Sequence, residues 1–165
     1  MNNQKLNWIR AGILGANDGI ISVATALIAL LGVIKPQTLT LVALATITAG
    51  TISMSAGEWV SVSTQRDAEK TQNLPNSQLT NPIHAAIASA GAFLVGALIP
   101  AALAILTQNA IWTIVGVIIA LTITGIVSSP SKSTISKNIG RNLVAGATAL
   151  TVSIIINITL NNITT

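Results

Sequence analysis

Residues 11–34 read AGILGANDGIISVATALIALLGVI, an apolar stretch that one acidic residue, Asp18, interrupts. About 20 apolar residues are enough for a helix to cross the hydrocarbon core of a bilayer, and this stretch is longer. Four stretches of similar character follow, at residues 39–63, 83–106, 110–128 and 143–160. We therefore expect an all-α integral membrane protein with five transmembrane helices.

The composition of the whole chain agrees with this expectation. Of its 165 residues, 51% are hydrophobic and only 7% are charged, and the mean hydropathy is +0.73. A typical soluble domain carries about 25% charged residues. The apolar runs are continuous and long, whereas membrane β-strands are segments of about ten residues with alternating polarity. The chain is therefore predicted to be a helical protein embedded in a lipid bilayer.

The basic residues predict how the helices are oriented. With five spans the termini lie on opposite sides, and all basic residues except Lys35 fall on the side of the N-terminus: Lys5, Arg10, Arg66, Lys70, Lys132, Lys137 and Arg141. Because Lys and Arg concentrate in cytoplasmic loops, we expect a cytoplasmic N-terminus and a non-cytoplasmic C-terminus. This distribution also accounts for the net charge of +4, so no nucleic-acid partner is expected.

The chain shows no separate soluble domain, so residues 1–165 are predicted to form one transmembrane domain. Its longest hydrophilic stretch, residues 64–82, is expected to be a short cytoplasmic loop. Residues 64–72 contain no Gly or Pro and can prolong the second helix, and Pro82 suits the first turn of the third. Because no targeting segment is recognisable, we expect a prokaryotic inner (plasma) membrane as the host membrane.

Only two of the charged residues, Asp18 and Glu58, lie inside the apolar stretches. A carboxylate at the centre of a bilayer costs about 2.5–3.5 kcal/mol on insertion scales, so each should face protein, water or a cation. Hydrocarbon favours the neutral carboxyl group and a divalent cation favours the ionised one, which gives a route to exchange of metal for protons. The alternative is an ion pair of either acid with Arg10 or Arg66.

Met54 lies one helical turn before Glu58 on the same face. A thioether beside a carboxylate suits a transition ion such as Fe²⁺ better than Na⁺ or Mg²⁺, although methionine also fills gaps in packing. Outside the spans, Asp67 and Glu69 either form a weak cation-attracting mouth or are neutralised by neighbouring basic residues. The candidate metal ligands are therefore Asp18, Met54 and Glu58.

Other features of the sequence concern packing rather than chemistry. The chain has no cysteine and shows no Ser-His-acid set, metalloprotease motif or phosphate loop, so neither an enzyme nor a permanently bound cofactor is expected. Small residues spaced by four lie on the second and third spans and suit close helix packing. They are Ser53, Gly57 and Ser61, and Ala88, Ala92 and Gly96.

Two motifs carry a resemblance to a known family. Residues 14–20, LGANDGI, and residues 53–63, SMSAGEWVSVS, followed by Gln65-Arg66-Asp67, resemble the first-helix and second-helix signatures of the vacuolar iron transporter family, which includes the nodulin-like proteins. The resemblance is strong over residues 8–100 and weaker beyond. Full-length members carry a glutamate-rich cytoplasmic domain where this chain has residues 64–82, so the chain resembles the shorter, nodulin-like branch.

The resemblance implies a dimeric transporter that moves Fe²⁺, and often Mn²⁺, out of the cytosol in exchange for protons. It implies that Asp18 and Met54 bind the ion in the membrane, that Glu58 is the acid of the second motif, and that the partner helps to form the pathway. We therefore predict a homodimeric, proton-coupled exporter in which Asp18 and Glu58 also carry the protons. The alternatives are a non-transporting membrane subunit that docks a partner and a passive cation channel.

Overall fold

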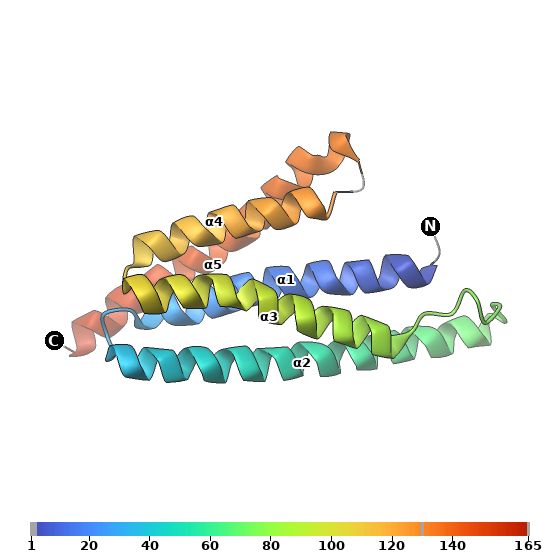
Figure 1. The fold of residues 1–165 in the computed structure, drawn as a ribbon, viewed down its shortest axis with the longest axis horizontal. Helices are drawn as coiled ribbons and strands as arrows, with labels where there is room; N and C mark the ends of the chain where they lie inside the picture. The colour runs from blue at the N-terminus through green and yellow to red at the C-terminus, as the bar shows by residue number, and fades with distance from the viewer. Residues whose placement is uncertain (1–2, 130, 165) are drawn as a thin grey trace.

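The structure, a computed structural model, describes residues 3–129 and 131–164 and consists of five long helices and one short 3-10 turn (Figure 1). The elements are α1 (Asn3–Leu30), α2 (Pro36–Thr71), α3 (Pro82–Thr107), α4 (Ala110–Val127), η1 (Lys132–Thr134) and α5 (Ile135–Thr164). All five α-helices are long and apolar enough to cross a membrane, and the described residues form no strand. The expected five-helix, all-α fold is confirmed.

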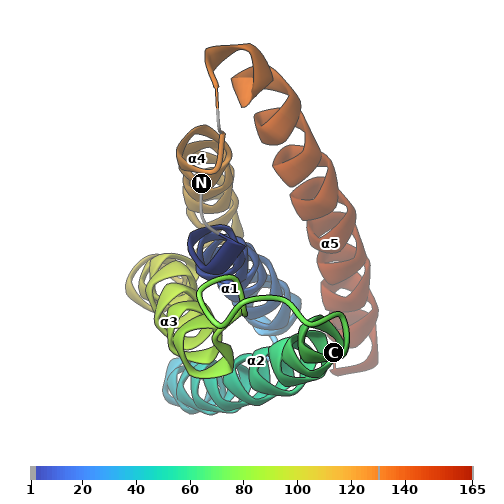
Figure 2. The ribbon, with the colours of Figure 1, turned by 90° about the vertical axis from the view of Figure 1, so that its right-hand side faces the viewer.

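The helices run roughly along one direction, and the two ends of the chain lie at opposite ends of the molecule (Figure 1). Helix α1 is central and packs against α2, α3, α4 and α5 (Figure 2). Helices α2 and α5 flank α1 without packing against each other in the part of the chain that the structure describes. One side of α1 is therefore left open between them.

The ends of the helices follow local sequence signals. Helix α2 continues to Thr71, as the lack of Gly and Pro in its polar end predicts. Helix α3 begins at Pro82, and the Asn81 side chain accepts hydrogen bonds from the first backbone N–H groups of that helix. Helix α1 ends at Leu30, short of residue 34, because Gly32 adopts a φ of 78°, a left-handed conformation that ends helices.

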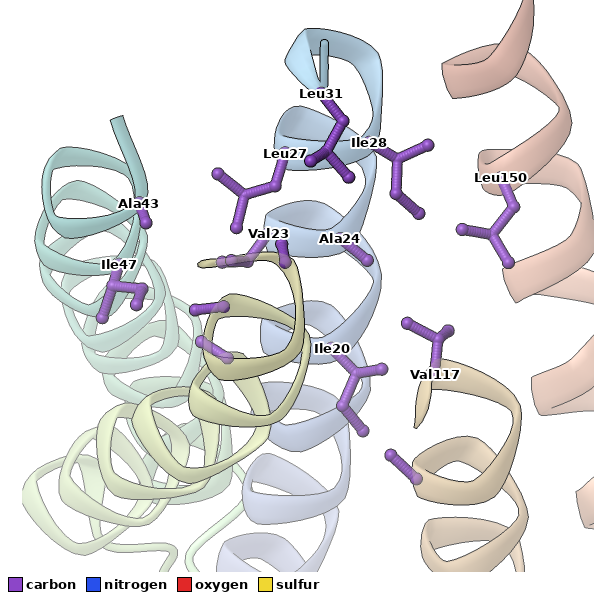
Figure 3. Close-up of a cluster of buried hydrophobic side chains, with 14 of the residues drawn as sticks. Ile20, Val23, Ala24, Leu27, Ile28, Leu31, Ala43, Ile47, Val117 and Leu150 are labelled. Carbon is purple, nitrogen blue, oxygen red and sulfur yellow. The ribbon is translucent and has the colours of Figure 1, made fainter. Parts of the chain in front are cut away.

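The apolar core is built around α1. Figure 3 shows Ile20, Val23, Ala24, Leu27 and Ile28 of α1, and Leu31 directly after it, in a cluster with Ala43 and Ile47 of α2, Val117 of α4 and Leu150 of α5. The outer surface of the bundle is also apolar, with large exposed side chains on every α-helix. Lipid tails are as apolar as these side chains, so helix association in a bilayer depends on close packing and interhelical hydrogen bonds.

Close packing is most evident between α1 and α3. A Cβ atom added at Gly15 would overlap the carbonyl oxygen of Ser89, and one added at Gly19 would overlap that of Phe93. On α3, a Cβ atom added at Gly96 would overlap the carbonyl oxygen of Ala16 in α1. Of the small-residue face of the third span, Gly96 therefore packs inside the bundle, whereas Ala88 and Ala92 are only partly buried. The face on the second span does not pack inside the bundle, because a Cβ at Gly57 would meet nothing within 4 Å.

Candidate functional site

Asp18 lies near the middle of α1, on the side of that helix that faces neither α3 nor α4. Gly15 and Gly19 contact α3, whereas the Asn17 side chain contacts α4 and α5. Helical geometry then directs Asp18 toward the remaining side of α1, where Leu14, one turn earlier, is 47% exposed. Asp18 itself is half-buried. It is thus reachable from outside this single chain.

No hydrogen bond or ion pair reaches the Asp18 carboxylate from any residue that the structure describes. The nearby hydroxyl groups are directed to the backbone of α1 instead. Ser22 donates to the Asp18 carbonyl oxygen at 2.6 Å, and Thr25 donates to the Ile21 carbonyl oxygen at 2.7 Å. Asp18 therefore does not form the ion pair that the sequence left open as an alternative.

Glu58 has a different environment. It is buried on α2, and its Oε1 atom lies 2.5 Å from Nη2 of Arg10 on α1. The Arg10 side chain is 52% exposed, against 5% for that of Glu58, and Arg10 also donates to the side-chain oxygen of Asn7 at 3.2 Å. For Glu58, the ion pair with Arg10 is therefore present.

Met54 is partly buried and packs against the apolar cluster around α1. This position fits the packing role that is common for methionine. Across residues 3–129 and 131–164, no three His, Cys, Asp or Glu side chains come together as a metal-binding group. A single chain thus brings no dense set of acidic ligands to Met54.

The acidic residues at the end of α2 have separate roles. Glu69 accepts hydrogen bonds from the backbone N–H of Thr80 at 2.7 Å and from its hydroxyl at 3.1 Å, and Arg66 donates to the Thr80 carbonyl oxygen at 2.9 Å. These bonds tie the loop before α3 to α2. Asp67 is exposed and lies 3.4 Å from the Lys70 ammonium group. Asp67 is the more accessible of the two acids.

A set of polar residues that the sequence analysis did not identify joins α1 to α4 and α5. Thr124 donates to the Asn17 side-chain oxygen at 2.8 Å, the Asn17 amide donates to the Asn142 side-chain oxygen at 3.1 Å, and the Asn142 amide donates to the Thr124 hydroxyl at 3.1 Å. Asn17 directly precedes Asp18 in the first motif. The sequence signal that could have found this set is Asn17, an asparagine within the apolar stretch at residues 11–34.

Two further side chains of α5 bind the backbone of α1. Ser153 donates to the Thr25 carbonyl oxygen at 2.7 Å, and Asn157 donates to the Ala29 and Leu31 carbonyl oxygens at 3.2 and 2.8 Å. The latter oxygens lie at the C-terminal end of α1, where helix carbonyl groups lack partners within the helix. Helix α5 is thus held to α1 by side-chain hydrogen bonds along much of its length.

Comparison with known proteins finds relatives among plant proteins named vacuolar iron transporter homologs. The chain is 39% identical over 127 residues to vacuolar iron transporter homolog 2.1 of Arabidopsis thaliana, covering 64% of this chain and 58% of the relative. It is 35% identical over 129 residues to vacuolar iron transporter homolog 2 of the same plant, covering 73% and 65%. A rice relative, vacuolar iron transporter homolog 5, is 41% identical over 106 residues, covering 58% and 50%.

The chain therefore spans only half to two thirds of the length of these curated relatives. Their names refer to the plant vacuole, so they give no support to the expected prokaryotic inner membrane. No solved structure matches the chain.

The family model of the VIT family matches residues 9–76 and 70–157. These ranges include both motifs of the first two helices, and they extend through α4 into most of α5, where the resemblance of the sequence is weaker. Since the match covers most of the chain and includes parts of all five membrane-spanning helices, this integral membrane protein belongs to the VIT family.

Proposed function

We propose that this protein is a proton-coupled transporter that exports Fe²⁺ and/or Mn²⁺ from the cytosol across a lipid bilayer. The observation that supports the proposal is the Asp18 carboxylate, which lies within a membrane span and has no partner among the described residues. A carboxylate in such a place is costly unless a cation or a proton compensates its charge. The relatives' name, vacuolar iron transporter homolog, supports iron as the cargo.

In this proposal, Asp18 and Met54 bind the ion within the membrane. An oxygen and a sulfur ligand together suit a divalent transition ion, which tolerates both. One chain offers no group of three acidic or histidine ligands in its described part. We therefore propose a homodimer, in which the partner contributes a second copy of each ligand at the open side of α1. The metal is cargo, and no permanently bound cofactor is invoked.

Glu58 is proposed to bind the ion nearer the cytosol and to share proton transfer with Asp18. Arg10 is paired with Oε1 of the Glu58 carboxylate, and in this proposal the guanidinium group moves away when a cation binds to Glu58. The half-exposed Arg10 side chain can be solvated when it does so. Asp67 is proposed as the more accessible acid of a weak cytoplasmic mouth, with Glu69 partly engaged in holding the loop. This arrangement assumes a cytoplasmic N-terminus.

The test uses the purified protein in vesicles with an imposed pH gradient. Uptake of Fe²⁺ and of Mn²⁺ is measured separately, together with internal pH. We expect metal flux coupled to proton counterflux in the wild type and loss of both in Asp18→Ala. Thr148→Val is the control, because the Thr148 hydroxyl is exposed and bonds only to its own helix, at the Val144 carbonyl oxygen.

Each other outcome contradicts a particular part of the proposal. A wild type that moves neither metal contradicts transport and favours a non-transporting membrane subunit. Metal flux without proton movement favours a passive channel. Normal transport by Asp18→Ala shows that the site is placed wrongly even though transport is real.

A further inference from the structure

Asn17, Thr124 and Asn142 form a closed ring of hydrogen bonds between three helices. Thr124 of α4 donates to Asn17 of α1, Asn17 donates to Asn142 of α5, and Asn142 donates back to Thr124, at 2.8, 3.1 and 3.1 Å. In this ring each side chain is both a donor and an acceptor. We refer to these three residues as the polar ring.

The three side chains of the polar ring are partly buried between helices α1, α4 and α5. The nearest additional acceptor is the Leu121 carbonyl oxygen, 3.0 Å from the Thr124 hydroxyl and 3.3 Å from the Asn142 amide. Amide groups in hydrocarbon are costly unless they are hydrogen-bonded. The three side chains satisfy one another only when α1, α4 and α5 have the relative rotation seen here, so the ring selects that rotation.

Other contacts of α1 also restrict its rotation, but none of the described side-chain hydrogen bonds among them joins α1 to α4. Ser153 and Asn157 of α5 bind backbone carbonyl oxygens of α1, which project around the helix at every turn. The contacts of Gly15 and Gly19 keep that face of α1 against α3, and the ion pair of Arg10 with Glu58 joins α1 to α2. Among the described hydrogen bonds within the spans, Asn17 is the α1 side chain that reaches α4 and α5. Because Asp18 is the next residue, the rotation that the ring selects also sets the direction of the Asp18 carboxylate.

We propose that Asn17, Thr124 and Asn142 are positioning residues that orient Asp18 toward the transported cation. They do not touch the ion and act through the rotation of α1. The inference rests on the proposed function, since it assigns the ring a part in binding the same cargo. It predicts that a change on α4, a helix that supplies none of the proposed ligands, alters the affinity for the metal.

The decisive variant is Thr124→Val, which removes the hydroxyl group at nearly constant volume. Thr124→Ser keeps the hydroxyl and should restore the wild-type behaviour. Thr122→Val is the matched control on the same helix, because the Thr122 hydroxyl donates only to its own helix, at the Ile118 carbonyl oxygen 2.7 Å away. The three variants are compared with the wild type in vesicles, by the dependence of Fe²⁺ or Mn²⁺ uptake on metal concentration.

We expect Thr124→Val to raise the KM for the metal by about threefold to tenfold, the range that loss of one or two interhelical hydrogen bonds in a bilayer produces. Thr124→Ser and Thr122→Val should keep the wild-type KM. A purely structural role would reduce the amount of active protein, which lowers the maximal rate and leaves KM unchanged. An unchanged KM in Thr124→Val, or a KM in Thr124→Ser as high as that of Thr124→Val, overturns the inference.

A second measurement does not depend on transport. The chain has no cysteine, so Leu14→Cys introduces a single thiol for a spin label, one turn from Asp18 on an exposed position. We expect Thr124→Val to broaden the range of label environments and Thr122→Val to leave the spectrum unchanged. If the wild type moves no metal, the proposed function fails, while the spectra still decide whether the ring fixes α1. Identical spectra with and without the Thr124 hydroxyl overturn that part.

Discussion

The guanidinium group of Arg10 on α1 donates a hydrogen bond to the buried carboxylate of Glu58 on α2, with 2.5 Å between Nη2 and Oε1. The pair joins the N-terminal part of α1 to the C-terminal half of α2. A carboxylate withdrawn from water is stable in its ionised form only with such a partner. The bond therefore links the stability of this end of the bundle to the charge of one arginine.

Removal of Arg10 should destabilise the protein because it leaves the Glu58 carboxylate buried without a partner. We expect Arg10→Gln to lower the free energy of unfolding by about 1–3 kcal/mol, the usual cost of an unsatisfied buried acceptor. Thermal unfolding in detergent micelles, followed by the fluorescence of the three tryptophans, measures the change. The double variant Arg10→Gln/Glu58→Gln should recover part of the loss, because it removes the uncompensated charge.

The control for this prediction is Lys70→Gln. Lys70 pairs with Asp67 at 3.4 Å, and both side chains are largely exposed. Exposed ion pairs contribute about 0–1 kcal/mol. Equal unfolding temperatures for Arg10→Gln and Lys70→Gln would contradict the assigned importance of the Arg10–Glu58 pair.

The close approach of α1 and α3 leads to a prediction about glycine. In Gly15→Ala the new methyl group would overlap the Ser89 carbonyl oxygen, so the helices must separate. We expect a loss of about 1–3 kcal/mol, as for other overpacked sites. Gly91→Ala on α3 has open space around the new atom and should gain about 0.5–1 kcal/mol from helix propensity. We expect the free energy of unfolding to fall in Gly15→Ala and to rise in Gly91→Ala. A Gly15→Ala variant as stable as the wild type would show that α1 and α3 are farther apart.

The bond between Asn157 and the end of α1 should also be measurable. Asn157→Ala removes donors to the Ala29 and Leu31 carbonyl oxygens, and we expect a loss of about 1 kcal/mol for hydrogen bonds of this kind in a bilayer. Asn162→Ala is a matched control on the same helix, since Asn162 is exposed. If both variants have the same free energy of unfolding as the wild type, the Asn157 hydrogen bonds do not hold α5 to α1.

The loop before α3 should detach from α2 when the Glu69 side chain is removed. Leu79 is 2% exposed, because the loop is tied to α2 through Thr80. We expect Glu69→Ala to make the Leu79–Thr80 bond accessible to chymotrypsin and to raise its cleavage rate severalfold, which mass spectrometry of the fragments can follow. Asp67→Ala should be cleaved like the wild type. Equal cleavage of the two variants would show that Glu69 does not secure the loop.

The five-helix fold could be predicted because the length of an apolar run is a property of the segment itself. The extension of α2 to Thr71 was equally local, since no Gly or Pro interrupts it. The sequence predicted the end of the first helix at residue 34, whereas α1 ends at Leu30. The difference arises because the pattern of apolar residues continues past Gly32, where the backbone turns. The apolar content of a segment predicts whether it can lie in lipid. The position at which a helix ends depends instead on the backbone conformation of particular residues.

The site was predictable only in part. Asp18 and Glu58 stand out in the sequence because their charge is out of place in hydrocarbon, but the choice of Arg10 as the partner of Glu58 depends on how α1 and α2 pack. The polar ring could not be found from spacing, since 107 residues separate Asn17 from Thr124 along the chain. Threonine is also common in apolar spans, where it bonds to its own helix, as Thr122 does. Whether Asp18, Met54 and Glu58 bind metal stays a prediction.

Helix α2 has 36 residues and is therefore about 54 Å long. A bilayer with its headgroups is about 40–45 Å thick, so one end of an upright α2 stands clear of the lipid. The basic side chains at its end, Arg66 and Lys70, mark that end as the one in water. The segment at residues 72–78, which is mostly exposed, is thus accessible from one compartment only. An antibody epitope inserted there would reveal, in intact membranes, which way the protein faces.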